Sequence, residues 1–289
     1  MKKSIKSISL VLVGSAFALF SCQTLDRPSL GNYPKDANAP GGPLKFFVAF
    51  DGTTTNDLLN AVDSIRANFP STNPLSSIDG VGGGKAIQGD ASNYISYPSP
   101  NDFGSTAGSF TISFWEKQDG IPAGNAAFLF TIPSANKWWG SYGFSMFLLF
   151  DQGSWTPAVD ATVKLYMVDD GDASNISDTW LTWEGSNRVP GVQDNQWHHM
   201  AFVYDATAST LTLYVDGVAN PNVAQWGTHG PLKINASNVQ ALNIGGNKSA
   251  LPGTDLGWGQ QWTGGLDQFR MYATALSATE VQALHTGQK

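Results

Sequence analysis

The stretch QWHHMAFVYDATASTLTLYVDGVA, residues 196–219, decides the fold because apolar and polar side chains alternate along it. Within it, 197–204 and 210–215 have the period of two that predicts β-strands, and the DG pair after the second run predicts a tight turn. Consecutive strand residues point to opposite faces of a sheet, so His198 and His199 cannot share one metal ion or form a proton relay. We therefore expect both histidines to be structural, and one of them to be hydrogen-bonded inside the fold.

The same alternation recurs along the rest of the chain. Thirty-one glycines, fifteen prolines and 12% aromatic residues suit many short strands joined by turns. About a dozen strands of this length predict an all-β fold of two packed antiparallel sheets rather than one open sheet. Further strands are expected at 45–51, 109–115, 126–132, 143–150, 162–168, 179–184, 240–245 and 266–272.

Two segments have helical rather than strand periodicity. Apolar residues recur at helical spacing over 56–69. Near the C-terminus, Ser277 and Glu280 match the S-x-x-E capping box, ahead of Val281 and Leu284. We expect this short C-terminal helix to cover a sheet edge or to close one end of the fold.

The N-terminus is typical of an export signal. Lysines precede an apolar run from Ile8 to Phe20, which is short for a membrane span but suits a secretory signal. The segment LFSC, residues 19–22, resembles a bacterial lipobox, although Phe20 is bulkier than the usual residue at its place. Cys22 is the chain's single cysteine, so no disulfide can form within the chain. We therefore predict a lipoprotein signal peptide at 1–21, lipidation at Cys22 and membrane anchoring outside the cytoplasm, at the outer membrane or cell surface.

The segment that follows is polar and rich in Pro and Gly. Residues 22–43 cannot bury enough apolar surface to form a core, so we predict a flexible tether there and a folded domain over 44–289. The net charge is −7 at pH 7, and no basic cluster follows residue 6. Nucleic acid is therefore not an expected partner, because binding to phosphates needs a local excess of Lys and Arg.

Five blocks of sequence resemble a known family in order and spacing. The blocks are GKAIQGDASNYISYP (84–98), SFTISFWEK (109–117), the 196–219 stretch, ALNIGG (241–246) and GGLDQFRMYATALSATEVQAL (264–284). Over roughly residues 45–286 they resemble the LamG-like jelly-roll domains of the concanavalin A-like lectin and glucanase superfamily. The resemblance implies a two-sheet antiparallel jelly-roll sandwich, with departures at 56–69 and at the Trp-rich stretch 133–195.

The resemblance also implies a structural calcium site. Such jelly rolls often hold Ca²⁺ between their first and last strands, and the matching acids here are Asp51 and Asp267. Carboxylate oxygens suit this hard cation. The alternative for Asp51, which precedes Gly52, is an ordinary turn aspartate. The acidic run 169–172 lacks the order of a calcium loop, and we expect a solvated turn there.

A catalytic site is not evident in the sequence. Retaining glycosidases need two carboxylates about 5.5 Å apart, and the chain's glutamates, Glu116, Glu184 and Glu280, form no such pattern. Glu184 is the one candidate acid that lies near aromatic residues. GVGGGK, residues 80–85, lacks the Ser/Thr and helix of a phosphate loop, so we expect a turn. No catalytic residue is assigned.

Tryptophans are more numerous than a sandwich core of this size needs. Ten are present, and seven of them lie outside the framework aromatic positions of the resembling family, which Trp115, Trp197 and Trp262 occupy. An exposed indole ring stacks well on the apolar face of a sugar, with amides and carboxylates bonding the hydroxyls. Capping of the sandwich ends is the alternative role for each ring. The predicted carbohydrate-binding residues are Trp138, Trp139, Trp226 and Trp258, with Asp255, Asn247 and Gln260 as polar partners.

The sequence therefore predicts a lipid-anchored surface protein that binds a polysaccharide or other glycan without cleaving it. Two alternatives stay open. One is an adhesin or structural domain that binds protein partners, and the other is a glycoside hydrolase or lyase that uses Glu184.

Overall fold

The predicted hairpin forms β10 (His198–Asp205) and β11 (Thr210–Val215), which pair antiparallel from Met200↔Val215 to Asp205↔Thr210. The structure is a computed structural model. It describes residues 42–51, 74–121, 125–135, 143–151, 159–248 and 259–287.

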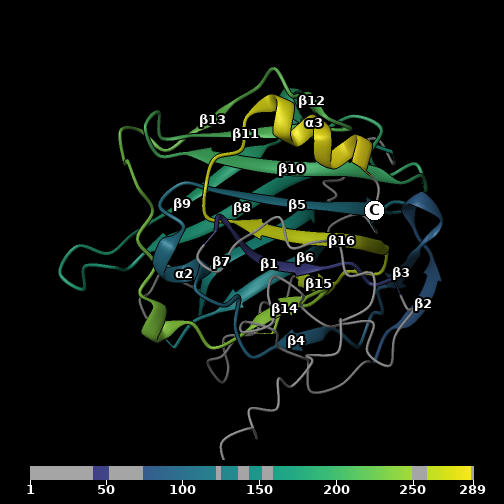
Figure 1. The fold of residues 1–289 in the computed structure, drawn as a ribbon, viewed down its shortest axis with the longest axis horizontal. Coiled ribbons are helices and arrows are strands. Elements are labelled where there is room, and N and C mark those ends of the chain that lie inside the picture. Colours follow the sequence, from purple (N-terminus) through teal and green to yellow (C-terminus); the bar gives the residue numbers. More distant parts are fainter. Residues whose placement is uncertain are drawn as a thin grey trace, which may run out of the picture. The chain divides into compact units, whose positions relative to one another are not determined.

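The hairpin belongs to the first of two sheets (Figure 1). Among the described residues this sheet has nine strands in the order β12-β11-β10-β5-β16-β3-β2, with β1 paired to β16 and β13 paired to β11. The remaining strands are β1 (Leu44–Val48), β2 (Ser76–Asp79), β3 (Lys85–Gln88), β5 (Phe110–Lys117), β12 (Val218–Ala219), β13 (Ala224–Gln225) and β16 (Gly265–Tyr272).

The second sheet has seven strands in the described parts of the chain, in the order β4-β14-β6-β7-β8-β9, and β15 pairs with β6. Apart from the parallel β15–β6 pair, the pairings of both sheets are antiparallel. Its strands are β4 (Ile95–Tyr97), β6 (Ala126–Pro133), β7 (Phe144–Asp151), β8 (Thr162–Asp169), β9 (Ser177–Trp183), β14 (Leu242–Ile244) and β15 (Gly259–Gln261). The protein is thus an all-β, two-sheet jelly-roll sandwich, as the sequence predicted.

One apolar core lies between the sheets because alternate residues of both sheets face inward. Phe110, Ile112 and Phe114 of β5 meet Leu148 and other residues of the second sheet in a single buried cluster. Aromatic rings dominate this layer, and burying each such side chain contributes about 1.5–3 kcal/mol.

The outer face of the second sheet is also apolar. Phe128, Phe147 and Tyr166 form a separate buried cluster there, with Trp180 half-buried at its margin. Phe147 lies 5.1 Å from Phe128 and 4.8 Å from Tyr166 between ring centroids. Strands β6, β7 and β8 are therefore apolar on both faces, which explains the unbroken run FSMFLLF.

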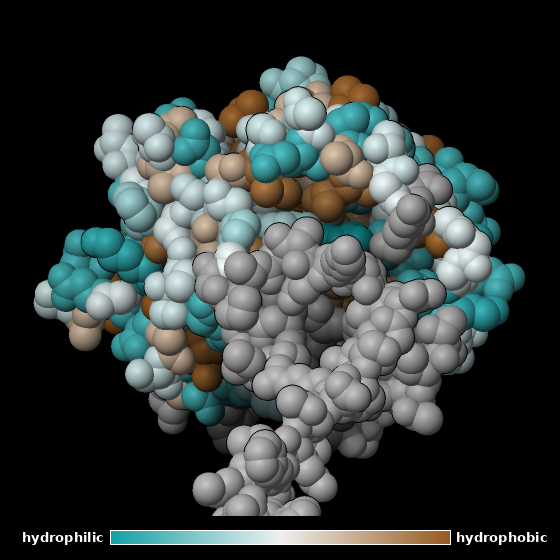
Figure 2. All heavy atoms as spheres, viewed as in Figure 1, coloured by the Kyte–Doolittle hydropathy of each residue, from teal (hydrophilic) through white to brown (hydrophobic). Residues whose placement is uncertain are grey.

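The C-terminal helix α3 (Ala278–Gly287) lies on the outer face of the first sheet, above β10 and β11 (Figure 1). Val281 is fully buried against Ala201 and Val203, and apolar side chains gather around the helix (Figure 2). The predicted capping box is confirmed, because the Glu280 carboxylate accepts from the backbone N–H of Ser277 at 2.7 Å. The fold also contains a one-turn helix α2 (Phe103–Thr106) and three 3₁₀ turns, η2 (Val81–Gly83), η3 (Gly185–Asn187) and η4 (Ala236–Asn238), in the described residues.

Several sequence predictions lie outside the described residues. These are the signal peptide, Cys22, most of the tether and the helix at 56–69. Among the residues that are described, no helix is long and apolar enough to cross a membrane.

Candidate functional site

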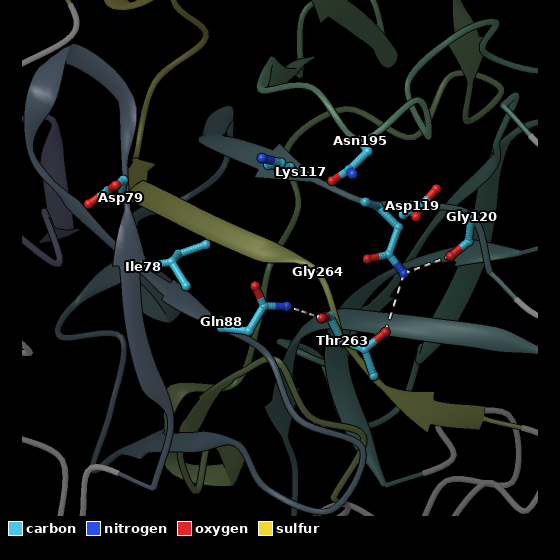
Figure 3. Close-up of a pocket in the computed structure, with 10 residues that line it drawn as sticks. Ile78, Asp79, Gln88, Lys117, Asp119, Gly120, Asn195, Thr263 and Gly264 are labelled. Atoms are coloured by element: carbon cyan, nitrogen blue, oxygen red, sulfur yellow. Dashed lines mark hydrogen bonds between the residues drawn. The ribbon is translucent and has the colours of Figure 1, made fainter.

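A polar pocket opens at one end of the first sheet, where β5 ends and β16 begins (Figure 3). Its volume is about 440 Å³, within the range of small-ligand sites. Strands β2 and β3 supply one wall, and the segments after β5 and before β10 supply the other. The lining residues are Ile78, Asp79, Gln88, Lys117, Gln118, Asp119, Gly120, Asn195, Thr263 and Gly264.

Hydrogen bonds between lining residues shape the pocket. The Gln118 side-chain amide donates to the Gly120 carbonyl at 3.1 Å and to the Thr263 hydroxyl at 3.4 Å. The Gln88 amide donates to the Thr263 carbonyl. Figure 3 shows Gln88 and Ile78 pointing toward Gly264 from the β2–β3 side, with Asp119 and Asn195 across the pocket.

The charges around the pocket nearly balance. Asp79 forms an ion pair with Lys85 at 2.7 Å, and the Lys85 ammonium holds the pKa of Asp79 below its ordinary value. Lys117 and Asp119 add one charge of each sign to the lining. A surface of amides, a hydroxyl and balanced charges can exchange hydrogen bonds with an uncharged polyol, because it presents donors and acceptors together.

Trp197 lies beside this pocket. A Cβ atom on Gly265 would lie 2.7 Å from the Trp197 ring and 3.1 Å from Ile78, so glycine lets the indole approach the β16 backbone. Gly265 pairs with Lys117 of β5 and with Gln88 of β3, and directly opposed residues share a face. The half-buried ring therefore lies on the same face of the sheet as two pocket-lining side chains.

The turn before β10 is fixed by His198. Its Nδ1 lies 2.9 Å from Asp216 and its Nε2 lies 3.1 Å from Asp194. The hydrogen bond to Asp216, and then that to Asp194, raises the pKa of His198 above its ordinary value against the effect of burial. Asn195, the next residue after Asp194, lines the pocket and donates its backbone N–H to the Gln118 carbonyl at 3.0 Å.

His199 points to the other face, as predicted. It is fully buried, and its Nε2 lies 2.8 Å from the Ser113 hydroxyl. Burial lowers its pKa to about 3. Both histidines thus have structural contacts on opposite faces, and the prediction that one is hydrogen-bonded inside the fold is confirmed.

The predicted metal ligands Asp51 and Asp267 meet at one loop. Asp51 accepts from the Lys85 N–H at 3.2 Å, and Asp267 accepts from the Val81 N–H at 2.9 Å. The loop between them is the 80–85 turn, which the sequence also predicted. A Cβ on Gly84 would collide with the Asp51 carboxylate, so this glycine is required for the close approach.

The chain is strained on both sides of this pair. Phe50 and Gln268 each have a positive φ, 61° and 50°, although neither is glycine. Such conformations persist where surrounding contacts impose them, and they cluster at functional sites. Asp267 lies at the bulge that interrupts the β16–β5 register.

These two carboxylates fit a calcium ion. Asp267 is fully buried and its Oδ1 has no hydrogen-bond partner among the described residues. Burial, aided by the charge of Asp51, raises the pKa of Asp267 to about 7. A cation would pair with both acids and satisfy the orphaned oxygen. The described residues contain no group of three His, Cys, Asp or Glu side chains that could hold a metal, so backbone oxygens or water would complete the shell.

The structure describes three of the predicted carbohydrate-binding residues, Trp226, Asn247 and Gln260. Trp226 is half-buried, and the His229 ring covers one of its faces at 3.5 Å between centroids. Its other contacts are with the main core, so it caps the sandwich rather than standing open. The Asn247 side chain donates to the Gly259 carbonyl at 3.0 Å, and Gln260 pairs with Ala127 of β6.

These three residues belong to different sheets, and the platform as a whole stays a prediction. Trp226 follows β13 of the first sheet, whereas Asn247 and Gln260 lie at β15 of the second sheet. Trp138, Trp139, Trp258 and Asp255 lie outside the described residues.

The acidic run 169–172 opens the turn between β8 and β9, as expected, and Gly171 and Asp172 are exposed, but its first two acids are not solvated. Asp169 and Asp170 are buried. Asp169 accepts from the Lys233 N–H at 3.0 Å and lies 3.0 Å from His229, while Asp170 accepts from the Asn235 N–H at 2.7 Å. The run anchors the 229–238 segment, and a sequence pattern does not show such long-range partners.

The three glutamates differ in their surroundings. Glu184 lies 3.5 Å from Lys164, which also pairs with Asp151 at 2.9 Å. Glu116 is fully buried, and neither of its carboxylate oxygens has a hydrogen-bond partner among the described residues. Burial, followed by the charges of Asp216 and Asp194, raises the pKa of Glu116 well above its ordinary value.

The pocket itself was missed from the sequence. Its signal was two polar runs at strand ends, KQDG at 117–120 and QDNQ at 193–196, which the Asn195–Gln118 backbone hydrogen bond joins in the fold. The family resemblance places Trp197 among the framework aromatics, so it does not single this residue out as part of a site. A polar run at the end of a strand indicates a pocket only when the fold shows that a second polar run lies next to it.

The two-sheet jelly-roll fold points to one superfamily. The profile of the concanavalin A-like lectin/glucanases superfamily matches residues 89–282, and the chain belongs to that superfamily. No curated protein matches the sequence.

Solved structures with the same fold include sugar complexes. The fourth domain of AbnA, a GH43 extracellular arabinanase from Geobacillus stearothermophilus, was solved with arabinotriose; it is 17% identical with a TM-score of 0.54, over 84% of this chain and 98% of that one. The binding domain of Paraclostridial Mosquitocidal Protein 1 is 16% identical with a TM-score of 0.55, over 85% and 52% of the two chains. The binding domain of Botulinum Neurotoxin DC in complex with SialylT is 9% identical with a TM-score of 0.54, over 86% and 52%. The present chain thus spans about half the length of the two toxin chains, and at these identities the likeness shows the fold alone.

Proposed function

We propose that this protein is a lipid-anchored, extracytoplasmic lectin-like protein that binds a glycan in the Trp197 pocket and does not cleave it. The observation that carries the proposal is the polar pocket beside a half-buried indole. Stacking on the ring would hold the apolar face of a sugar, and the amides of Gln88, Gln118 and Asn195 would bond its hydroxyl groups. A neutral sugar suits the balanced charges of the lining.

The sugar complexes of two structural neighbours support the class of ligand. Lipid attachment at Cys22 and a location at the outer membrane or cell surface remain proposals from the N-terminal sequence. We also propose that Asp51 and Asp267 hold a structural Ca²⁺ that fixes the 80–85 turn, one residue beyond the pocket-lining Asp79.

Binding of the full-length chain to immobilised glycans tests the proposal and separates the alternative sites. We expect Trp197→Ala to weaken retardation in an affinity gel about tenfold or more, because the stacking surface is removed. Asn195→Ala should weaken it less, through one lost hydrogen bond. Trp180→Ala, on the outer face of the second sheet, is the matched control and should bind normally.

Other results of these binding experiments would favour a different site or a different function. Loss of binding in Trp138→Ala and Trp258→Ala, with Trp197→Ala unaffected, would move the site to the tryptophans predicted first. No retardation by any glycan would favour the adhesin alternative. Release of reducing sugar that disappears in Glu184→Gln would show an enzyme.

A further inference from the structure

The imidazole of His198 is held between two carboxylates. Asp216 lies 2.9 Å from Nδ1 and Asp194 lies 3.1 Å from Nε2. Ionised carboxylates only accept hydrogen bonds, so both contacts are hydrogen bonds only when both ring nitrogens carry protons. The geometry is therefore that of an imidazolium ion.

The two carboxylates are anchored unequally. Asp216 also accepts from the His199 N–H at 2.8 Å, and its own N–H donates to the His199 carbonyl at 2.8 Å. Besides its contact with His198, the Asp194 carboxylate accepts from the Gln196 N–H of its own turn at 2.9 Å, and the described residues show no bond from it to another strand. If one contact of His198 is lost, the Asp194 side is the one that can move.

The Asp194 side is also the pocket side. Asn195, which lines the pocket, adopts a positive φ of 64° between Asp194 and the rest of the turn. Trp197, which lies over Gly265, is the residue directly before His198. The bonds of His198 thus fix the segment 194–197 from both of its ends.

We propose that protonated His198 latches the 194–197 wall of the pocket, and that its deprotonation as the pH rises frees Asp194 and loosens this wall. A neutral imidazole donates from one nitrogen only, and its other lone pair would face a carboxylate. The consequence for sugar binding rests on the proposed function, whereas the latch itself does not. Binding should therefore weaken as the pH rises.

The acidic groups that face His198 favour its protonated form at low pH. Asp194, Asp216 and Glu116 are the acids around the ring, Glu116 being its partner across the β10–β5 ladder. The pKa of His198 is raised, so its bonds are complete below about pH 6.5 and are lost as the pH rises through the folded-state value. Burial is the largest influence on the pKa values of Asp194 and Asp216 and acts to raise them. The His198 hydrogen bond, a backbone N–H donor and the charge of His198 together lower both pKa values below the ordinary value, so both acids stay ionised across this range.

Deuterium uptake by the 193–198 segment tests the latch without any ligand. It is measured on the full-length protein from about pH 5.5 to about pH 9 and corrected for the intrinsic exchange rate. We expect uptake to become about tenfold faster at the alkaline end, the effect of losing one charge-assisted hydrogen bond. Ring ¹⁵N shifts of His198 should show two protonated nitrogens at the acidic end and one at the alkaline end.

Two variants give opposite expectations. His198→Gln should exchange fast at every pH, because no imidazolium forms. Asp194→Asn should exchange slowly at every pH, because its amide accepts from the imidazolium and donates to the neutral ring. His229→Gln, whose ring contacts Asp169 away from the latch, is the matched histidine control and should keep the wild-type pH profile.

A wild-type segment with no pH dependence would overturn the latch, as would an unchanged profile in Asp194→Asn. If His198→Gln does not fold, Asp194→Asn and the ring shifts still decide the question. Weak glycan binding with an intact exchange profile would refute the proposed function alone.

Discussion

Glu116 and Glu280 carry the same carboxyl group but respond to pH in opposite directions. Glu116 is fully buried near the C-terminal end of β5, and burial raises its pKa well above 4.5. Glu280 is exposed, and the N–H and hydroxyl of Ser277 hold its pKa below its ordinary value. Position in the fold, rather than residue type, decides which form of the acid the folded state prefers.

We predict that Glu116→Gln stabilises the protein at alkaline pH. The folded-state pKa of Glu116 lies above the unfolded value of 4.5. The wild-type protein therefore has its full stability below about pH 4.5 and loses part of it as the pH rises toward the folded-state pKa of Glu116. The amide carries no charge to bury, so the variant should be more stable than the wild type by about 1–3 kcal/mol near pH 8. Near pH 4 the two should differ little, as measured by urea unfolding.

Glu280→Gln is the control of opposite sign. Its lowered pKa contributes stability that is present above 4.5 and is lost as the pH falls, so this variant should lose stability at pH 8 and approach the wild type at low pH. An equal difference between Glu116→Gln and the wild type at pH 4 and pH 8 would rule out the assignment of Glu116 as a buried neutral acid.

At the scale of elements, long strands could be predicted and two-residue strands could not. β5, β7, β8 and β10 have eight residues each, enough for alternation to be visible in the sequence. β12 and β13 have two residues each, and their extended form depends on pairing with β11. A two-residue strand has no period of its own, so its position follows from its neighbour.

The start of the C-terminal helix could be predicted from the local sequence alone. Its capping box was predicted because both partners lie within one turn of sequence, Ser277 and Glu280. We predict that Ser277→Ala lowers the stability of the protein by about 1 kcal/mol, since the N-cap bond to the Glu280 N–H is lost. Thermal unfolding measures the loss, and Ser277→Asp, which restores a capping acceptor, should recover most of it.

A Ser277→Ala variant as stable as the wild type would mean that packing of Val281, not capping, fixes the helix. Fluorescence of buried Trp115 gives a second readout. The His285 ring of α3 lies 5.5 Å from that indole, so fraying of the helix should change its environment.

At the scale of the whole molecule, sites are built from distant segments, and this limits prediction. The pocket joins β2, β3, the end of β5, the turn before β10 and the start of β16. Composition and tryptophan counts indicate a binding protein but cannot place residues from five segments together. Asp51 and Asp267 could be paired from the sequence only because the resembling family often holds Ca²⁺ between its first and last strands.

The last prediction concerns these two acids and the stability of the whole sandwich. They join the first and last strands, β1 and β16, to the 80–85 turn, so a cation between them would tie three segments together. With an affinity in the range of extracellular calcium sites, about 10 mM Ca²⁺ should stabilise the fold by about 1.4–2.7 kcal/mol. This corresponds to a rise in Tm of roughly 3–8 °C. EDTA should reverse the rise, and Mg²⁺ should reproduce little of it because it keeps its water shell. Asp51→Asn and Asp267→Asn should each abolish the calcium-dependent shift, whereas Asp79→Asn, an acid on the same hairpin, should retain it. An identical Tm with Ca²⁺ and with EDTA would leave Asp267 as a buried neutral acid, held by burial and by the Val81 N–H alone.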